Sequence, residues 1–513
     1  MSDILSGIIK FAGKNFPQTF QKIKNSALNI PAINRLVIDR LASSTAARPH
    51  PFSLFAPYTS WQSLTDRSFT GRHLPVADKS YSDFVNNIPL PQVGELFRRK
   101  ELIPCTRSSA MFMNFAQWFT DGFLRTDPVD NRKNTSNHEI DLCQIYGLHP
   151  VITDQLRAKT GGRMKSQIIG GEEYPPYAFE NGVQKPEFSK LIVWGPKTTS
   201  IPLGLTPEEA EKRQANLFAM GTERANSTLG YATLNTLFIR EHNRVAGILE
   251  KAYPTWDDER IFQTTRNILI VILIKIVVED YIAHISTINL KADPSVSYNK
   301  KWYRNNWMTI EFDLLYRWHA LTPDKFNVPS GEVPFNDYMY NNALLTESGI
   351  GKMMSAFSAQ HAGQIGLYNT PNFLFPIEAA NVAYTRKFQL RSYNEYRVCF
   401  GLPAAKDFSD ITKNPALQAE LKKLYGSVDK VEWYVGMYAE DRSYGAMMGD
   451  LQTAMVANDA FSQALTNPLL AENVFNPDTF SPVGWEIILE TNKLDQLLAR
   501  NSKSGLHCSF RKN

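Results

Sequence analysis

The most apolar stretch of the chain is NILIVILIKIVVEDY, residues 267–281. Lys275 interrupts it, and it falls well short of the ~20 apolar residues that cross a bilayer. Because a helix that is apolar on every side is covered by other elements, we expect a helix buried in a large core, not a membrane span. Thr255 and Asp258 resemble a capping pair that opens this helix.

Helical patterns dominate after about residue 75. Apolar periodicity and the prolines that follow it predict helices over residues 108–128, 227–254 and 308–323. The clearest exception is residues 163–182, whose Gly-Gly turn and proline pair suit a small hairpin. Without repeats or linkers in this part, we predict a mainly α protein with very little β and one large domain over residues 71–513.

Residues 1–70 form a separate N-terminal segment. Within residues 1–45, Lys and Arg alternate with Ile, Leu and Phe at helical spacing. This pattern is typical of amphipathic helices in a membrane interface, and equally of helices packed on the protein's own core. The proline- and aromatic-rich residues 48–61 indicate a connecting loop.

Composition narrows the classes of function. A formal net charge of +4 is too small to indicate nucleic-acid binding. The four cysteines lie far apart without a CxxC pair, which argues against a disulfide scaffold and a structural zinc site. Because the N-terminus also lacks an uninterrupted apolar signal region, we predict a cytoplasmic protein without a signal peptide.

The segment LLYRWHALTPDKF, residues 314–326, carries the first candidate site. Tyr316 and His319 are three residues apart and would share one helix face, with Trp318 beside them. An aromatic-rich core helix explains this pattern, and so does a metal ligand next to an oxidisable phenol. Since no HExxH, phosphate-loop, GxSxG or dinucleotide motif occurs, histidine chemistry is the chemistry left to consider.

A second candidate set lies earlier in the chain. Gln117 and Asp121 are four residues apart and would face the same way on an otherwise apolar helix. Arg224 is expected to open the long helix that follows. Each of these residues also has an ordinary structural explanation.

Together these segments resemble the animal-type haem peroxidase superfamily, and within it the cyclooxygenase (prostaglandin endoperoxide synthase) and fatty-acid dioxygenase branch. The resemblance covers nearly the whole chain and runs in order through YTSW (58–61), FRRKELIP (97–104), FAQWFT (115–120), EIDLCQIYG (139–147), QIIGGEEYPP (167–176), REHNRV (240–245), IKIVVEDY (274–281), EFDLLYRWH (311–319), YNNALL (340–345) and YNEYR (393–397). It implies one haem peroxidase domain with haem b between core helices. The chain lacks the disulfide-rich module of the animal enzymes, which agrees with a bacterial homologue.

The resemblance also implies roles for single residues. His319 matches the proximal ligand of the haem iron, and Tyr316 matches the tyrosine whose radical takes a hydrogen atom from the fatty acid. Gln117 matches the distal glutamine. The other matches are Trp318, Phe312 and Leu315 as neighbours of Tyr316, Tyr281 as its hydrogen-bond partner, Ser462 as the channel serine and Arg40 as the arginine that meets the substrate carboxylate.

Four positions depart from the family pattern. Asp121 stands where the distal histidine moves a proton between the peroxide oxygens. A desolvated aspartic acid could keep that role, whereas pairing with Arg224 would leave it ionised and able to act only as a base. Arg224, in GTERAN, resembles the peroxidase branch and not the cyclooxygenases. Ile288 replaces the channel-entrance tyrosine, and Gly122 replaces an aspartate of calcium-binding relatives, so we expect no calcium.

The leading hypothesis is a haem-dependent dioxygenase. Peroxide activates the haem, Tyr316 takes hydrogen from an unsaturated fatty acid, and O2 adds to give a hydroperoxide or endoperoxide. One alternative is a general haem peroxidase that oxidises small donors. Another is a membrane-associated haem-binding protein with little turnover. The resemblance further suggests a homodimer.

Overall fold

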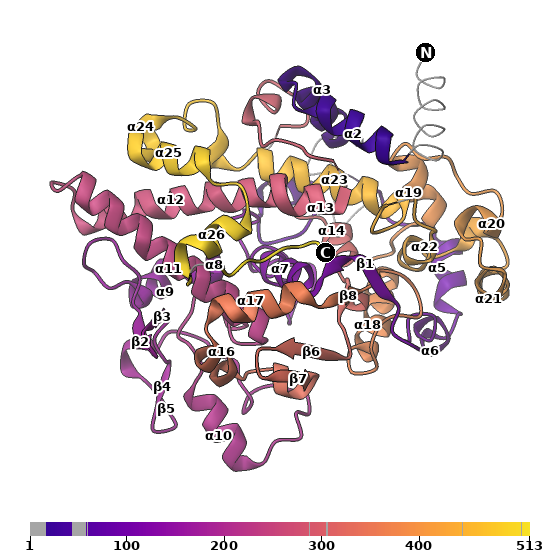
Figure 1. Cartoon of the computed structure of the whole chain (residues 1–513). Coiled ribbons are helices and arrows are strands. Elements are labelled where there is room, and N and C mark those ends of the chain that lie inside the picture. Colours follow the sequence, from indigo (N-terminus) through magenta and orange to yellow (C-terminus); the bar gives the residue numbers. More distant parts are fainter. Residues whose placement is uncertain are drawn as a thin grey trace.

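The computed structural model describes residues 17–43, 58, 60–286, 288–303, 306–443, 445–503 and 505–512. Across these residues the chain is mainly helical, and its strands form four two-stranded sheets (Figure 1). The fold class predicted from the sequence is therefore confirmed.

Two long helices form the centre of the fold. The first, α11 (Leu229–Ala252), packs against the second, α12 (Asp258–Ile276), and also against α7 (Ala110–Thr120) and α17 (Ile350–Ala359). The N-terminal half of α11 is completely buried, so α11 lies inside the protein with other helices around it. The sequence predicted this helix with nearly the observed limits.

The predicted buried helix is α12. It continues directly into a π-helical turn, η2 (Val277–Ile282), and then α13 (Ala283–Ser286). Its N-cap is Asp257, whose side chain accepts from the Arg260 N–H, and not the expected Thr255. Lys275 reaches the surface, where its ammonium donates to the Leu489 carbonyl oxygen at 3.0 Å. None of the helices found in the described residues combines the length and the apolar character needed to span a bilayer.

Two predicted helices end early. α7 ends at Thr120, with Asp121 as its C-cap, although its apolar pattern continues to residue 128. The helix expected over residues 308–323 is in fact two pieces, α14 (Ile310–Leu315) and the 3₁₀ turn η4 (His319–Leu321). Tyr316 and His319 therefore do not share one continuous helix, which corrects the sequence prediction.

Local hydrogen bonds explain this break. The backbone leaves the helical region at Trp318, with φ −83° and ψ 48°. The N–H of Trp318 donates to the Tyr316 carbonyl oxygen at 2.8 Å. The Tyr438 hydroxyl donates to the Arg317 carbonyl oxygen at 2.8 Å, so a side chain replaces the next helical turn as the partner of that carbonyl.

The hairpin predicted around the Gly-Gly pair is present. β2 (Gln167–Ile169) pairs antiparallel with β3 (Glu172–Tyr174). Gly170 and Gly171 connect them with φ values of +58° and +80°, a combination that favours glycine. The other pairs are β1 (Pro104–Ser109) with β8 (His361–Gly363), β4 (Phe179–Glu180) with β5 (Val183–Gln184), and β6 (Lys325–Val328) with β7 (Gly331–Pro334).

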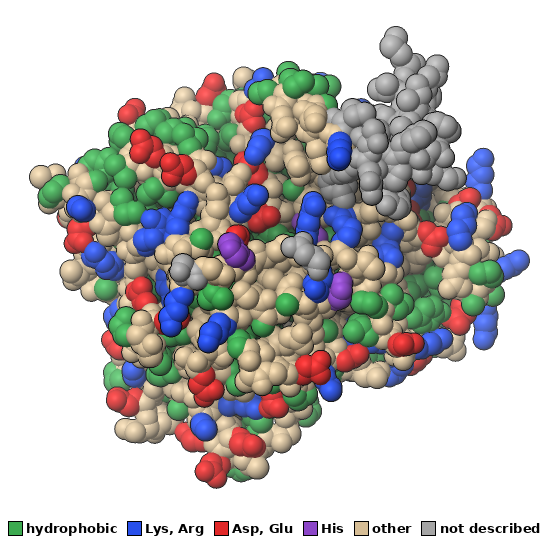
Figure 2. Space-filling view, in the orientation of Figure 1, with side chains coloured by type: hydrophobic (Ala, Val, Ile, Leu, Met, Phe, Trp, Pro, Cys, Tyr) green, Lys and Arg blue, Asp and Glu red, His purple; other side chains and the backbone are tan. Residues whose placement is uncertain are grey.

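The described part of the N-terminal segment forms α2 (Pro17–Leu28) and α3 (Pro31–Ala42), which lie together at one edge of the molecule (Figure 1). α3 packs on α23 (Asp450–Leu465) through buried Ile38 and Ala42. Its outer face is apolar in part, because Leu36 is 68% exposed, and green side chains are visible there in Figure 2. The first amphipathic piece and most of the connecting loop lie outside the described residues.

The remaining helices cover the core. They are α4 (Trp61–Thr65), α5 (Lys79–Asn86), α6 (Leu90–Gly94), α8 (Cys143–Tyr146), α9 (Pro150–Leu156), α10 (Pro207–Ala215), α15 (Phe335–Tyr338), α16 (Asn342–Ser348), α18 (Phe375–Lys387), α19 (Tyr393–Cys399), α20 (Phe408–Ile411), α21 (Pro415–Tyr425), α22 (Trp433–Ala439), α24 (Pro477–Phe480), α25 (Pro482–Glu490) and α26 (Leu494–Asn501).

Candidate functional site

A cavity of about 590 Å³ lies between α7, α14, η4 and α18. Apolar side chains from these elements and from residues 326–340 form much of its wall. Six residues singled out in the sequence all line it: Gln117, Asp121, Arg224, Tyr316, Trp318 and His319. Segments separated by up to two hundred residues thus meet at one pocket, whose size and lining suit a cofactor.

His319 is oriented by a buried carboxylate. Its Nδ1 lies 3.0 Å from Oε1 of Glu378 on α18, a side chain that is only 2% exposed. With Nδ1 occupied in this way, Nε2 is the ring nitrogen available to a ligand in the cavity. A histidine with one nitrogen held by a carboxylate is the usual arrangement of an axial metal ligand.

Three further donors fix Glu378. Thr370 Oγ1 donates to Oε1 at 2.9 Å, while the Tyr434 hydroxyl and Asn381 Nδ2 donate to Oε2 at 2.9 and 3.2 Å. Burial by itself would raise the pKa of Glu378, but the His319 imidazole and these donors outweigh burial and hold the pKa below its ordinary value. The sequence analysis missed Glu378, because nothing in its local pattern distinguishes it from the other acids of the chain.

Tyr316 is packed by aromatic rings. The Trp318 ring stacks on it with centroids 4.5 Å apart, and Phe312 meets it edge-on at 5.0 Å. Tyr281, on the π-helical turn η2, is fully buried and stacks on Phe112 at 5.0 Å. These contacts hold the Tyr316 ring in one orientation on the cavity wall.

The hydroxyls of Tyr281 and Tyr316 face the same buried space. Neither makes a hydrogen bond of standard geometry with another described residue. Burial raises the pKa of both phenols, with Asp459 adding to the effect on Tyr316 and the Tyr316 phenol adding to that on Tyr281. Both side chains are therefore neutral phenols near neutral pH.

Gln117 and Asp121 reach the cavity from α7 and its C-cap. Thr228 Oγ1 donates to Oε1 of Gln117 at 3.4 Å. Arg224 Nη1 lies 3.1 Å from Oδ1 of Asp121, whose side chain is 16% exposed. Arg224 does not open α11 as expected; it stands in the turn before Thr228, which is the N-cap.

Two opposing effects act on Asp121. Burial raises the pKa of its carboxyl, and the positive charge of Arg224 counteracts burial without cancelling it. The sequence analysis treated desolvation and the arginine pair as alternatives. In the structure both operate, and the pKa of Asp121 ends above its ordinary value.

The other predicted residues lie off this cavity wall. Phe312, Leu315 and Ser462 are buried, and the Ser462 hydroxyl donates to the Asn458 carbonyl oxygen at 2.8 Å. Arg40 is exposed on α3, and Ile288 is partly buried against the core. The structure therefore brings the predicted haem-side residues together, while Arg40 stays apart from them.

The chain is similar to known proteins over nearly its whole length. The family described as "Animal haem peroxidase" matches residues 61–510. Prostaglandin G/H synthase 2 from Mus musculus is 33% identical over 508 residues, covering 96% of this chain and 80% of the relative. Prostaglandin G/H synthase 1 from Rattus norvegicus is 32% identical over 491 residues, covering 93% of this chain and 78% of the relative.

Solved structures share the fold at lower sequence identity. Fatty acid alpha-dioxygenase from Oryza sativa has a TM-score of 0.69 at 15% identity, covering 93% of this chain and 91% of that one. Peroxidase A from Dictyostelium discoideum has a TM-score of 0.66 at 19% identity, covering 91% of this chain and 95% of that one.

If His319 holds the haem iron, we predict that Glu378→Gln weakens the bond between its Nε2 and the iron. Removal of the charge on the Nδ1 partner makes the imidazole a poorer donor, so haem affinity falls about 10–100-fold. The iron–histidine stretching band of the reduced, haem-loaded protein shifts to lower frequency. Glu440→Gln, which removes another buried carboxylate that is bonded to Tyr393, is the matched control and leaves that band in place. An unshifted band in Glu378→Gln contradicts the assignment.

Proposed function

Because the chain belongs to the animal haem peroxidase family, we propose that it is a haem-dependent fatty-acid dioxygenase in which Tyr316 carries the reactive radical. The family and its relatives make the chain an oxidoreductase of the dioxygenase and peroxidase kind. The observation that carries the proposal is the placement of Tyr316 and His319 on one cavity wall, with Tyr281 buried beside Tyr316.

The residues present fit haem b. The cavity has a volume of about 590 Å³, mostly apolar walls and one imidazole whose Nδ1 is already bonded to Glu378. His319 would hold the haem iron through Nε2, and Gln117 with Asp121 would line the same cavity. Haem bound here would supply the one-electron oxidation of Tyr316 once a peroxide has reacted with it.

Tyr316 would perform the hydrogen transfer. Its radical takes a hydrogen atom from the fatty acid, so a C–H bond breaks, the Tyr316 O–H bond forms and a carbon radical remains. O2 adds to this carbon, and a hydrogen atom returned from Tyr316 completes a hydroperoxide and restores the tyrosyl radical. Stacking by Trp318 and the edge contact of Phe312 keep the ring oriented through each turnover.

Asp121 would move the proton of the activating peroxide. As a carboxylate it can accept that proton, and its raised pKa makes it a stronger base than an ordinary aspartate, so that it holds the proton until the second oxygen takes it. The ion pair with Arg224 opposes this proton uptake, because it favours the charged form. We therefore expect weaker peroxidase turnover than a distal histidine supports.

A general haem peroxidase is the second candidate. The position of Arg224 on the cavity wall favours it, since a guanidinium there can bind an anionic group of a small donor. Asp121 disfavours a general peroxidase, because its ion pair with Arg224 limits proton transfer from the peroxide. The substrate that is consumed distinguishes a peroxidase from a dioxygenase. A peroxidase consumes peroxide in proportion to the donor that it oxidises, whereas a dioxygenase consumes O2.

We also propose that the N-terminal segment contacts a membrane surface. α3 turns Ile38 inward and presents Leu36 outward, with Ile30 at its start 52% exposed. Arg35 and Arg40, both exposed, lie on the same helix and would face the head groups. Arg40 would then stand where a fatty acid leaves the lipid. There it would meet the substrate carboxylate, the role that the family resemblance implies.

We predict that Tyr316→Phe abolishes O2 uptake with linoleic acid and a trace of hydroperoxide. Phenylalanine keeps the ring packing but has no O–H bond to exchange. O2 uptake is measured on haem-loaded protein, with the Soret band as the check on the haem site. Tyr340→Phe is the matched control, because Tyr340 also lines the cavity and is 3% exposed, and it retains uptake. Equal uptake by Tyr316→Phe and wild type removes Tyr316 from the reaction.

Arg224→Gln is expected to shift the pH dependence of the reaction with hydrogen peroxide. Since the Arg224 charge lowers the pKa of Asp121, its removal raises that pKa. The reaction rate depends on the ionised carboxylate, so the midpoint of its rise with pH moves to a higher pH. Stopped-flow absorbance of the Soret band gives the midpoint. Asp121→Asn has no such midpoint, and Arg132→Gln, on the surface beside Asp130, keeps that of wild type. An identical midpoint in Arg224→Gln and wild type assigns the titration to another group.

The double variant Ile30→Glu/Leu36→Glu tests the membrane contact without removing the core face of α3. We expect about 10–100-fold weaker sedimentation with anionic phospholipid vesicles, because taking a leucine-sized side chain out of lipid costs about 1.5–3 kcal/mol. Val129→Glu, at an apolar position that is 93% exposed elsewhere, leaves sedimentation unchanged. Undiminished sedimentation of the double variant rules out α3 as the contact.

A further inference from the structure

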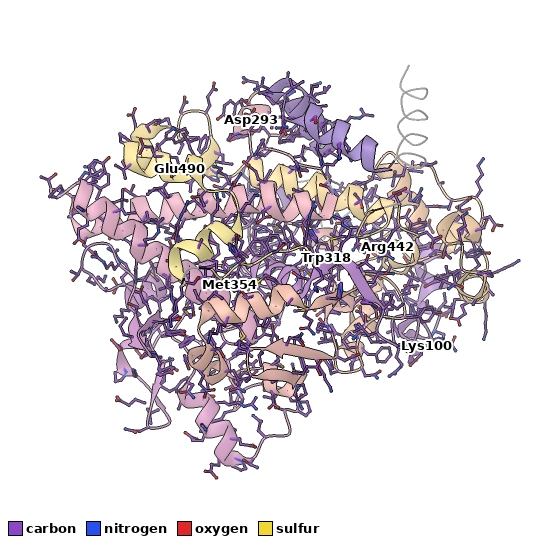
Figure 3. The ribbon with its side chains drawn as sticks, viewed as in Figure 1. Lys100, Asp293, Trp318, Met354, Arg442 and Glu490 are labelled. Atoms are coloured by element: carbon purple, nitrogen blue, oxygen red, sulfur yellow. The ribbon has the colours of Figure 1, made fainter. Side chains whose placement is uncertain are left out.

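The segment FRRKELIP, residues 97–104, contains three consecutive cations that differ in their surroundings. Lys100 is exposed, Arg98 is partly exposed, and Arg99 is only 6% exposed. Figure 3 labels Lys100, which lies at the surface near the helix that Figure 1 labels α6. Arg99 is thus the cation of the three that turns into the protein, where its N–H groups must find acceptors.

The guanidinium of Arg99 binds the backbone directly after His319. Its Nη2 donates to the carbonyl oxygens of Ala320 and Thr322 at 3.3 and 2.7 Å. Its Nη1 donates to Oδ1 of Asp324 at 2.7 Å. Ala320 belongs to the 3₁₀ turn η4, and Thr322 is the C-cap of that turn. One planar side chain therefore holds the C-terminal end of the turn that carries His319.

The same side chain also binds the loop that fixes Glu378. Nε and Nη2 of Arg99 donate to the Asn369 carbonyl oxygen at 2.9 and 2.6 Å. The backbone N–H of Arg99 donates to the Thr370 carbonyl oxygen at 2.9 Å. Thr370 Oγ1 in turn donates to Oε1 of Glu378, the oxygen that lies 3.0 Å from Nδ1 of His319. Arg99 is therefore bonded to both segments whose relative position sets the contact between His319 and Glu378.

These contacts form a closed circuit. It runs from His319 along η4 to Arg99, from Arg99 through Thr370 to Glu378, and from Glu378 back to Nδ1 of His319. Arg99, Thr370 and Glu378 are each at most 6% exposed. Because water cannot easily replace a lost partner at such buried positions, removal of one member loosens the contacts of the others.

η4 depends on contacts from outside for its position. It has only three residues, too few for internal hydrogen bonds to hold it in place. Gly363 of β8 packs directly on the Ala320 carbonyl, and a Cβ at position 363 would clash with that oxygen. Glycine is therefore required there by close approach. The carbonyl that Arg99 binds is thus confined by β8 as well, and the turn has one position in the packed core.

We infer that Arg99 is a positioning residue for the haem ligand, because it fixes η4 against residues 369–370 and so keeps Nδ1 of His319 on Glu378. The inference rests on the proposed function for the identity of the group that His319 holds. Arg99 is not among the described residues that line the cavity, so it acts on the site through His319. The fork of its guanidinium reaches three carbonyl oxygens at once, which the single ammonium of a lysine does not reproduce.

The iron–histidine stretching band of the reduced, haem-loaded protein tests this inference. Arg99→Gln and Arg99→Lys are both expected to broaden the band and move it to lower frequency, and to weaken haem binding about 10–100-fold, because each loses the fork that holds η4. Arg240→Gln is the matched control. Arg240 is also 6% exposed and also donates to two backbone carbonyl oxygens, those of Glu173 and Asn501, so its loss leaves the band and the haem affinity in place.

Three outcomes overturn the inference. A wild-type band in both Arg99 variants excludes Arg99 as a positioning residue. A band that moves to higher frequency in Arg99→Gln and keeps its wild-type place in Arg99→Lys assigns to Arg99 an effect of charge on the imidazole and not one of position. A band that shifts equally in Arg240→Gln assigns the change to a general loss of stability.

Failure of the proposed function is recognised separately. In the haem-free full chain with isotopically labelled histidine, nuclear magnetic resonance gives the ring nitrogen signals of His319, which are identified by their loss in His319→Gln. Positioning by Arg99 predicts that these signals shift and broaden in Arg99→Gln and stay in place in Arg240→Gln, whether or not the chain supports O2 uptake. Unchanged signals in haem-free Arg99→Gln contradict the inference even if the proposed function holds.

Discussion

The hydrogen bond between His319 and Glu378 is the interaction on which the arrangement of the site depends. It joins η4 to α18, and through Tyr434 it joins both to α22, so three elements far apart in the chain are held at one carboxylate. A buried carboxylate is stable only when its oxygens are bonded, and here two of the partners of Glu378, His319 and Asn381, line the cavity. The orientation of the imidazole is therefore a property of the packed core and not of the local helix.

Much of the fold could be predicted from periodicity, because periodicity reports which residues are buried. The apolar run at 267–281 and the pattern at 227–254 became α12 and α11, and the Gly-Gly pair became a hairpin. The family resemblance identified six of the residues that line the cavity around His319. The break after Leu315 could not be predicted in the same way, because it depends on the Tyr438 hydroxyl, a partner about 120 residues away. Glu378 was missed for the same reason, since only tertiary contacts distinguish it from other acids.

The contact between Asp121 and Arg224 shows how two departures from the family pattern act together. With Asp121 alone in an apolar wall, burial would favour the neutral acid, and the carboxyl would be a poor acceptor for a peroxide proton. With Arg224 alone, an unpaired guanidinium would face the cavity. Their contact at 3.1 Å leaves a carboxyl with a raised pKa and an arginine with a partner. Asp121 and Arg224 are thus electrostatically coupled, and a change in either residue alters the charge state that the other favours.

The break between α14 and η4 also determines the surroundings of Tyr316. The side chains of Tyr316, Trp318 and His319 line the cavity of about 590 Å³, while the Arg317 carbonyl oxygen accepts from the Tyr438 hydroxyl. A continuous helix would bond that carbonyl to its own next turn and leave Tyr438 without it. With the break, Tyr316 and His319 line one cavity without sharing a continuous helix. Under the proposed function, the substrate would then react at Tyr316 and would not need to touch the haem iron.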